Sequence, residues 1–190
     1  LNAPGGGDQE WLDQVRRNFA VDAWLGNRDV FGMSYDNILT DESGTPWRID
    51  NGGALLFRAM GAKKTDFGGQ VTELDVFRTG KKAKVFGSGM SKEQELDGAQ
   101  RVLAITPDQI EDRVAEAGLP KSLADTLKAR RSYIAQYYGL PLPESIKPQD
   151  TDQVATTAPL VDAADIAKGK GKSRKWTQPL SLSQAGFIVN

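Results

Sequence analysis

Three polar side chains in the first third of the chain, Asp29, Asn37 and Asp50, are of the types that hold a metal ion against a phosphate. Their carboxylate and amide oxygens are the ligands that Mg²⁺ prefers in proteins. Phosphoryl transfer needs a carboxylate that orients the accepting group, and an amide and a carboxylate that hold the metal against the phosphates. Gly52 and Gly53 follow Asp50 and would let the backbone turn sharply beside such a phosphate. This set predicts a site for metal-dependent phosphate chemistry.

The absence of two residue types narrows the possible chemistry. The 190 residues include no Cys and no His. This excludes disulfides, thiol nucleophiles, thiolate zinc sites and Ser-His-Asp catalysis. Only carboxylates, amides, hydroxyls, Lys and Arg remain for catalysis or binding, and that set suits Mg²⁺ and phosphate. Proteins without catalytic function also lack both residue types, so a non-catalytic role stays open.

A helix and a hairpin are expected to position the three residues. Apolar side chains at helical spacing predict one helix over residues 9–25, which Asp8 caps and Gly26 ends. Residues 37–40 and 46–50 have the composition of short strands and flank a polar turn, which predicts a β-hairpin. The three tryptophans of this region are expected in the hydrophobic core: Trp11, Trp24 and Trp47.

The hairpin would bring Asn37 and Asp50 together at its open end. Asp29, in the loop that leads into the hairpin, could face the same point. A simpler interpretation is also open, because Asn, Asp and Gly dominate turns through local hydrogen bonds. On that interpretation Asn37 and Asp50 hold the hairpin together, and Asp29 satisfies its own loop.

Three helices are expected in the middle of the chain. Residues 61–90, rich in Gly and Lys, have the composition of a loop. Helices are then expected over residues 94–105, 107–118 and 120–138, as a small bundle with its charged side chains in solvent. The signals for their ends are two capping-box patterns, Ser91 with Gln94 and Thr106 with Gln109, the helix-starting Pro107, and the helix-ending Gly118 and Gly139.

At the candidate site the sequence resembles the atypical kinases, namely the HipA-like and phosphatidylinositol-4-kinase-like group of the protein-kinase-like superfamily. Asn27-Arg28-Asp29 resembles the catalytic loop of that group, Asn37 its metal-binding Asn, and Asp50 its metal-binding Asp. The most specific part is Ile49-Asp50-Asn51-Gly52. The resemblance covers roughly residues 20–60, a stretch that also resembles kinase-like segments of phage and prophage proteins.

The resemblance implies a fold, a set of roles and two cofactors. The fold would be α+β and mainly helical, like a kinase C-lobe with a short β-hairpin and a helical bundle, over residues 1–139. Asp29 would be the catalytic residue, Asn37 and Asp50 would bind Mg²⁺, and both of these with Gly52 would bind ATP.

The sequence departs from the kinase pattern in two ways. Asn37 lies eight positions after Asp29, further than is usual in the group, so a longer loop is expected. Only 28 residues precede Asp29, and they contain neither a glycine-rich nucleotide loop nor a strand Lys paired with a helix Glu. Two functions therefore stay open. One is an ATP- and Mg²⁺-dependent phosphotransferase, with its N-lobe parts supplied elsewhere. The other is a non-catalytic, pseudokinase-like assembly or structural protein, such as a phage particle component.

Residues 140–190 are expected to form an extended polar and basic tail that contacts another protein chain. A basic run begins at Lys168 and ends at Lys175, which keeps polyanion binding open, although a net charge of −1 gives no global attraction for nucleic acid. The sequence has no apolar run of membrane-spanning length and no signal segment. We therefore expect no membrane partner and a cytoplasmic location, or a virion-associated one for a phage protein.

Overall fold

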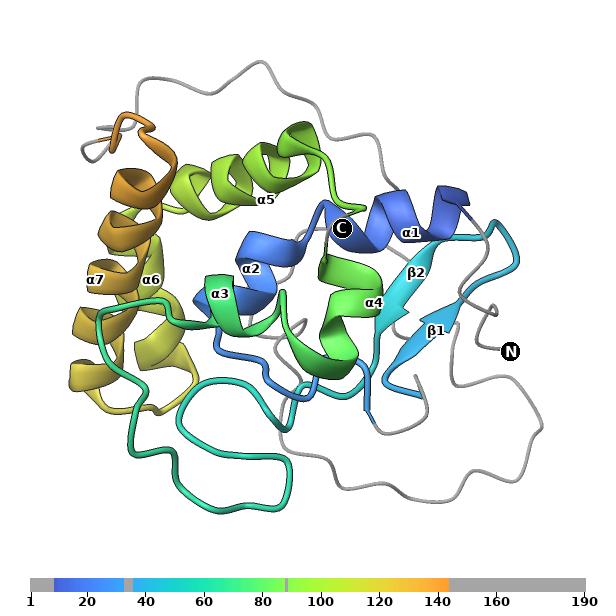
Figure 1. Cartoon of the computed structure of the whole chain (residues 1–190). Helices are drawn as coiled ribbons and strands as arrows, with labels where there is room; N and C mark the ends of the chain where they lie inside the picture. Colours follow the sequence, from blue (N-terminus) through green and yellow to red (C-terminus); the bar gives the residue numbers. More distant parts are fainter. Residues whose placement is uncertain (1–8, 33–35, 88, 144–190) are drawn as a thin grey trace, which may run out of the picture. The chain divides into compact units, whose positions relative to one another are not determined.

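The structure is a computed structural model that describes residues 9–32, 36–87 and 89–143 (Figure 1). In these ranges the chain forms seven α-helices, one 3₁₀ helix and one sheet of two antiparallel strands, which confirms the expected α+β and mainly helical class. In chain order the elements are α1 (Gln9–Arg16), α2 (Phe19–Trp24), β1 (Ile38–Thr40), β2 (Pro46–Arg48), α3 (Glu73–Val76), η1 (Gly80–Lys82), α4 (Ala83–Phe86), α5 (Lys92–Ala104), α6 (Pro107–Glu116) and α7 (Lys121–Tyr138).

The prediction of a single helix over residues 9–25 is wrong, because this segment forms two helices, α1 and α2. The break falls where α5 packs closely against the backbone. A Cβ on Gly98 of α5 would lie 2.9 Å from the carbonyl oxygen of Arg17 and 3.0 Å from the nitrogen of Ala20. This contact between distant segments is not visible in helical spacing. Gly26 ends α2 as predicted, with a left-handed φ of 61°. The Asp8 cap lies outside the described residues.

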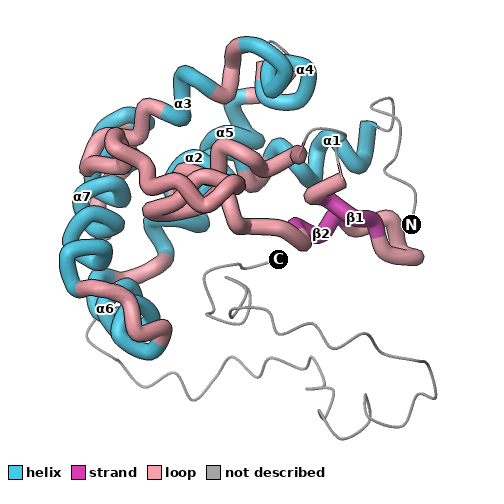
Figure 2. The backbone as a smooth tube through the Cα atoms, turned by 90° about the horizontal axis from the view of Figure 1, so that it is seen from below, coloured by secondary structure: helices cyan, strands magenta, loops and turns pink. Residues whose placement is uncertain are grey.

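The hairpin expected over residues 37–40 and 46–50 is confirmed. Strands β1 and β2 pair antiparallel and lie at one end of the described part of the chain, with α6 and α7 at the other (Figure 2). The hydrogen-bonded register pairs Ile38 with Arg48, Leu39 with Trp47 and Thr40 with Pro46.

The hairpin turn is organised by the carboxylate of Asp41. It accepts hydrogen bonds from the backbone nitrogens of Ser43 (2.9 Å) and Thr45 (3.0 Å), and from the indole Nε1 of Trp47 (2.7 Å). Bonds from the Ser43 hydroxyl and from Trp47 lower the pKa of Asp41 to about 2. Because this bond holds the indole at the solvent side, Trp47 is 39% exposed, and its expected place in the core is wrong. Trp11 and Trp24 are buried as predicted.

A buried ion pair ties the hairpin to the helices. The Arg48 guanidinium donates from Nε to one carboxylate oxygen of Asp22 in α2 (2.7 Å) and from Nη2 to the other. Nη2 also reaches the carbonyl oxygen of Val15 in α1 at 3.3 Å. Both partners of the pair are almost fully buried, and burial raises the pKa of Asp22. A two-bond Arg–carboxylate pair fixes orientation as well as distance, so the strand that leads to Asp50 has a set position.

The prediction that residues 61–90 are mostly loop is confirmed, although three short helices, α3, η1 and α4, lie within them. These short helices bring Phe77 and Phe86 into the core beside Phe19 of α2. The ring centroids of Phe19 and Phe86 lie 5.1 Å apart, and those of Phe77 and Phe86 lie 5.9 Å apart. Elements of four residues are too short to show a period, so only tertiary packing defines them.

The three helices expected in the middle of the chain are confirmed as α5, α6 and α7. Both capping boxes form in full, with Ser91 and Gln94 at α5 and Thr106 and Gln109 at α6. Helix α5 packs against α2 and α7, and α6 packs against α7. The charged side chains of this bundle are expected in solvent. This prediction is wrong for Arg130 and Arg131, which are 0% and 3% exposed.

Candidate functional site

The segment Asn27-Arg28-Asp29 follows α2 directly and has its first two side chains anchored. The Asn27 amide nitrogen donates to the side-chain oxygen of Asn51 at 3.1 Å. The Arg28 guanidinium forms ion pairs with Asp66 (2.7 Å) and with the buried Glu73 of α3 (2.9 Å). These contacts anchor the two residues before Asp29 and do not use the Asp29 carboxylate.

Asn37 is joined to Asp29 by its amide group. Its Nδ2 donates to the backbone oxygen of Asp29 at 2.7 Å and lies 3.4 Å from the carboxylate oxygen Oδ2 of Asp29. The side chain of Asn37 is nearly buried, with 9% exposure. Because Nδ2 is committed to Asp29, the opposite atom, Oδ1, is the acceptor that faces away from it. The structure therefore brings together two of the three predicted site residues.

The oxygen of the Asn37 amide faces a space left by Gly32. A Cβ on Gly32 would lie 3.0 Å from Asn37 Oδ1, and it would also collide with a carboxylate oxygen of Asp36. Gly32 has a left-handed φ of 67°, so a side chain there would be strained for backbone reasons as well. Oxygen atoms from two neighbouring side chains, Asp36 and Asn37, thus lie close to the backbone of Gly32.

Asp50 is next to Asn37 through the backbone of the hairpin. The Ile49 nitrogen donates to the Asn37 carbonyl oxygen at 3.0 Å, which extends the pairing of β1 and β2 by one residue. The Asp50 side chain is exposed, and its Oδ1 accepts a hydrogen bond from the Gly52 nitrogen at 2.8 Å. Among the described residues, no hydrogen bond or ion pair joins its carboxylate to Asp29 or Asn37. The Asp50 carboxylate is therefore not part of the contact between Asp29 and Asn37, and its partner is the Gly52 nitrogen.

Gly53 packs directly on Asp29. A Cβ at Gly53 would lie 2.7 Å from the Cβ of Asp29 and 3.2 Å from its backbone nitrogen, closer than side chains approach in folded proteins. The second glycine after Asp50 is thus required by the approach of two backbone segments. It places the end of the hairpin strand against the loop that carries Asp29.

A buried lysine, Lys64, stabilises the contact between the Asp29 loop and the segment after the hairpin. Its ammonium donates to the carbonyl oxygens of Gly26 (2.6 Å), Gly53 (2.7 Å) and Leu55 (2.9 Å). It therefore joins the end of α2, ahead of Asp29, to the segment after Asp50. Burial lowers the pKa of Lys64 to about 8, so the ammonium is mostly charged at neutral pH.

A second lysine, Lys82 of η1, lies close enough to Asp29 for the two charges to interact. Burial lowers the pKa of Lys82, and the Asp29 carboxylate partly offsets this effect. The Lys82 ammonium also lies 5.7 Å from the centre of the Phe77 ring. The sequence interpretation missed both Lys64 and Lys82, because they lie in the segment predicted as loop. Each is the second residue of a Lys-Lys pair, a pattern that does not distinguish a buried lysine from an exposed one.

The donor atoms of the site fit a magnesium ion that keeps part of its water shell. Mg²⁺ in phosphate-handling sites is bound by one or two protein ligands, together with waters and phosphate oxygens. Asn37 Oδ1, Asp29 and Asp50 provide oxygen donors of this kind. In the part of the chain that the structure describes, no three acidic side chains converge on one point. A cation here would therefore need the amide oxygen and ligands from outside the protein.

Comparison of the chain with protein-family models, with curated proteins and with solved structures found no match. Within the described ranges, no helix has the length and apolar character needed to cross a membrane. The resemblance to atypical kinases therefore rests on the sequence of the site residues and stays a prediction.

Proposed function

We propose that the chain carries a phosphotransferase-like site that binds ATP and Mg²⁺, the C-lobe part of a kinase-like fold. The main observation in support of the proposal is that Asn37, at the open end of the hairpin, is hydrogen-bonded to Asp29. A single amide group binds both the backbone and the carboxylate of Asp29, and Asp50 follows the end of the partner strand β2 by two residues. A turn residue that only closes a hairpin has no need to reach a loop eight positions earlier in the chain.

Each residue of the site has a distinct proposed role. Asp29 orients the hydroxyl group that accepts the phosphoryl group and takes up its proton. Asn37 Oδ1 and an Asp50 oxygen hold the metal. When bound, Mg²⁺ neutralises charge on the phosphate oxygens. Gly52 lets the backbone lie close to the phosphates, and Lys82 contributes positive charge on the side of Asp29. The acceptor is not defined by these residues, and the parts that cover the nucleotide come from another segment or chain.

Calorimetric titration of ATP, with and without Mg²⁺, tests this proposal. The key variant is Asp50→Asn, which can keep the hydrogen bond from the Gly52 nitrogen but loses the carboxylate charge. Asp112→Asn is the matched control, because Asp112 is an exposed carboxylate on α6. We expect Mg²⁺-dependent binding in the wild type and in the control, and none in Asp50→Asn. Equal binding in all three proteins, or binding that needs no metal, would contradict the assigned roles.

A second candidate function is supported by exposed apolar side chains near the hairpin. Trp47, Ile49, Phe57 and Met60 are between 39% and 95% exposed. Such side chains suit a contact with another protein. In this alternative the chain is a non-catalytic, pseudokinase-like assembly protein. Sedimentation analysis over a range of concentrations would then show self-association that Met60→Ser weakens, and ATP would not bind. A monomer at every concentration would contradict this alternative.

A further inference from the structure

Arg131 of α7 is a buried charge without an acidic partner among the described residues. Its side chain is nearly fully buried. Both of its hydrogen bonds leave from Nη2, to the carbonyl oxygen of Leu103 (2.7 Å) and to that of Pro143 (3.2 Å). Its Nε is buried and has no acceptor. Burial lowers the pKa of Arg131, and no neighbouring acid offsets this effect.

The preceding residue shows how this fold satisfies a buried guanidinium. Arg130 donates from Nε to Trp24, from Nη1 to Gly68 and Gln70, and from Nη2 to Ala23, always to carbonyl oxygens at 2.7–3.0 Å. Its Nη2 also forms an ion pair with the Glu73 carboxylate at 2.8 Å. A guanidinium has five N–H donors, and Arg130 uses all three of its nitrogens. Among the described residues Arg131 uses one nitrogen, Nη2, and its Nε is shielded from solvent, which leaves Nη1 as the nitrogen for a ligand.

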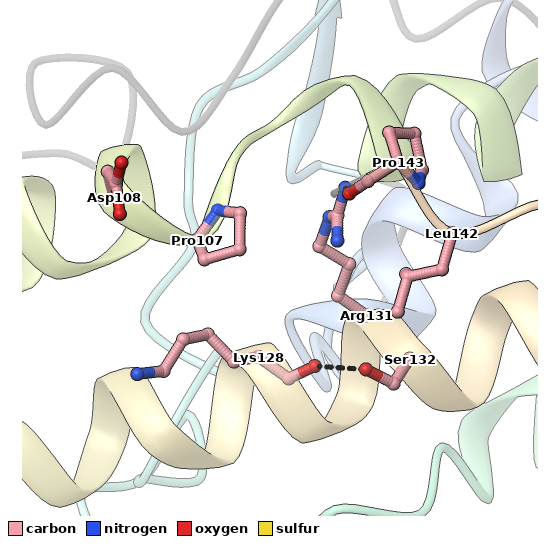
Figure 3. Close-up of a pocket in the computed structure, with 7 residues that line it drawn as sticks. All are labelled: Pro107, Asp108, Lys128, Arg131, Ser132, Leu142 and Pro143. Carbon is pink, nitrogen blue, oxygen red and sulfur yellow. Dashed lines mark hydrogen bonds between the residues drawn. The ribbon is translucent and has the colours of Figure 1, made fainter. Parts of the chain in front are cut away.

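Arg131 lines a pocket of about 400 Å³ between α6, α7 and the segment after α7 (Figure 3). Pro107, Leu142 and Pro143 give the pocket apolar walls. The volume suits a small molecule or a single side chain.

The other polar groups of the pocket either have partners of their own or lie away from Arg131. Lys128 forms ion pairs with Glu111 and with Asp125, and the Ser132 hydroxyl donates to the Lys128 carbonyl oxygen at 3.2 Å. Asp108 lies beyond Pro107, away from Arg131 (Figure 3). Its negative charge disfavours a dianion such as phosphate more than it disfavours a monoanion.

We propose that this pocket binds a carboxylate group attached to a short aliphatic body, with Arg131 as its counter-ion. A carboxylate supplies the acceptors and the negative charge that a buried guanidinium requires. The apolar walls accommodate the aliphatic part. The carboxylate has two possible sources, a free small molecule or a side chain of this protein. Glu144, which follows Pro143 in the sequence and lies outside the described residues, is the candidate for the second source.

Titration of sodium propionate into the full chain, followed by the Nε–Hε NMR signal of Arg131, tests the proposal. Sodium chloride at equal ionic strength is the control for a general anion effect, and Arg131→Met assigns the signal. The same titration, read from backbone amides of α7, is repeated on Arg131→Met, on Arg113→Met as an exposed control, and on Glu144→Gln. Leu142→Glu, which places a carboxylate at the lip of the pocket, is a second variant that leaves Arg131 intact.

Free carboxylate is the ligand when propionate produces saturable shifts in the wild type and binds about tenfold or more weakly to Arg131→Met and Leu142→Glu. Glu144 is the ligand when propionate binds to Glu144→Gln but not to the wild type. The proposal is overturned when neither protein binds propionate, when chloride produces the same shifts, or when Arg131→Met and Leu142→Glu bind as tightly as the wild type.

Discussion

Lys64 is the residue whose hydrogen bonds we expect to contribute most to the geometry of the candidate site. Its ammonium is buried and joins three carbonyl oxygens, those of Gly26, Gly53 and Leu55, at 2.6–2.9 Å. The first lies before the loop that carries Asp29, and the other two lie after the hairpin. Replacing Lys64 by Met keeps the apolar length of the side chain and removes all three bonds. The variant therefore tests whether this lysine holds the two segments together.

The expected loss of stability follows from two opposing contributions. Hydrogen bonds to a charged group are worth about 1.5–3 kcal/mol each, so three of them contribute about 5–9 kcal/mol. Burial lowers the pKa of Lys64 from 10.5 to about 8. At about 1.4 kcal/mol per pKa unit this burial costs about 3 kcal/mol. We therefore expect Lys64→Met to lower the free energy of unfolding at neutral pH by about 2–6 kcal/mol, an interval that includes the roughly 3–5 kcal/mol found when one partner of a buried charged pair is removed.

The pKa of Lys64 also predicts how the difference between the two proteins depends on pH. Between the folded pKa of about 8 and the unfolded value of 10.5, the unfolded chain holds a proton on Lys64 that the folded chain has released. Stability rises with pH wherever the unfolded state binds more protons. The contribution of Lys64 to stability is therefore complete above pH 10.5 and decreases as the pH falls through 8. The advantage of the wild type over Lys64→Met should grow from neutral pH to about pH 10.

Urea denaturation of both proteins, at neutral pH and at about pH 10, measures this difference directly. The other ionisable groups are present in both proteins, so their contributions cancel in the difference. Lys121→Met is a matched control, because Lys121 is exposed at the start of α7. A Lys64→Met variant as stable as the control at neutral pH would refute the reasoning about hydrogen bonds. An advantage that shrinks at high pH would refute the reasoning about burial.

Three further changes have clear expected outcomes. Gly53→Ala should cost about 1–3 kcal/mol in urea denaturation and displace the Asp29 amide signal, because its Cβ would lie 2.7 Å from the Asp29 Cβ; an unchanged Asp29 signal would contradict this. Arg130→Met should cost about 3–5 kcal/mol by the same measurement, whereas Arg131→Met, which removes a charge without a described acidic partner, should cost less than about 1 kcal/mol; equal costs would contradict the contrast. Gly98→Ala should lower the thermal midpoint by several degrees, since α5 would have to move away from α1 and α2; an unchanged midpoint would show that the contact is loose.

Local sequence signals predicted the helices whose start or end is marked by a capping box or a left-handed glycine. The capping boxes at Ser91 and Thr106, and the left-handed glycines Gly26, Gly118 and Gly139, are all found where the sequence placed them. Each of these signals acts over a few residues, so one stretch of sequence contains both partners. The hairpin was predictable for the same reason, because its turn residues lie between the two strands.

The interactions that the sequence did not reveal join residues far apart in the chain. Arg130 reaches Ala23 and Trp24, and its acidic partner is Glu73. A charged residue on a helix is normally exposed, so nothing in the local pattern distinguishes Arg130 from a solvated arginine. The opposite error occurred at Trp47, where a local hydrogen bond to Asp41 keeps an aromatic ring at the surface.

At the candidate site, the sequence predicted which residues lie near one another but not what holds them there. The backbone proximity of Asn37 and Asp50 follows from the hairpin, whereas the contact between Asn37 and Asp29 joins the hairpin to the loop before it. The dependence of this arrangement on Lys64, and the presence of Lys82 beside Asp29, required the packing of residues 61–90. The metal and nucleotide roles of the three site residues stay predictions.

The measurement that tests the central claim most directly is paramagnetic broadening by Mn²⁺, a substitute for Mg²⁺, in the presence of ATP. Amide signals of the full chain would be recorded before and after small additions of the metal. The account predicts selective loss of the signals around Asn37 and Asp50, followed by Asp29, while signals of α6 persist, and no selective loss in Asp50→Asn. Uniform broadening over the whole chain, or selective broadening that is the same in Asp50→Asn, would contradict a metal and phosphate site at the open end of this hairpin.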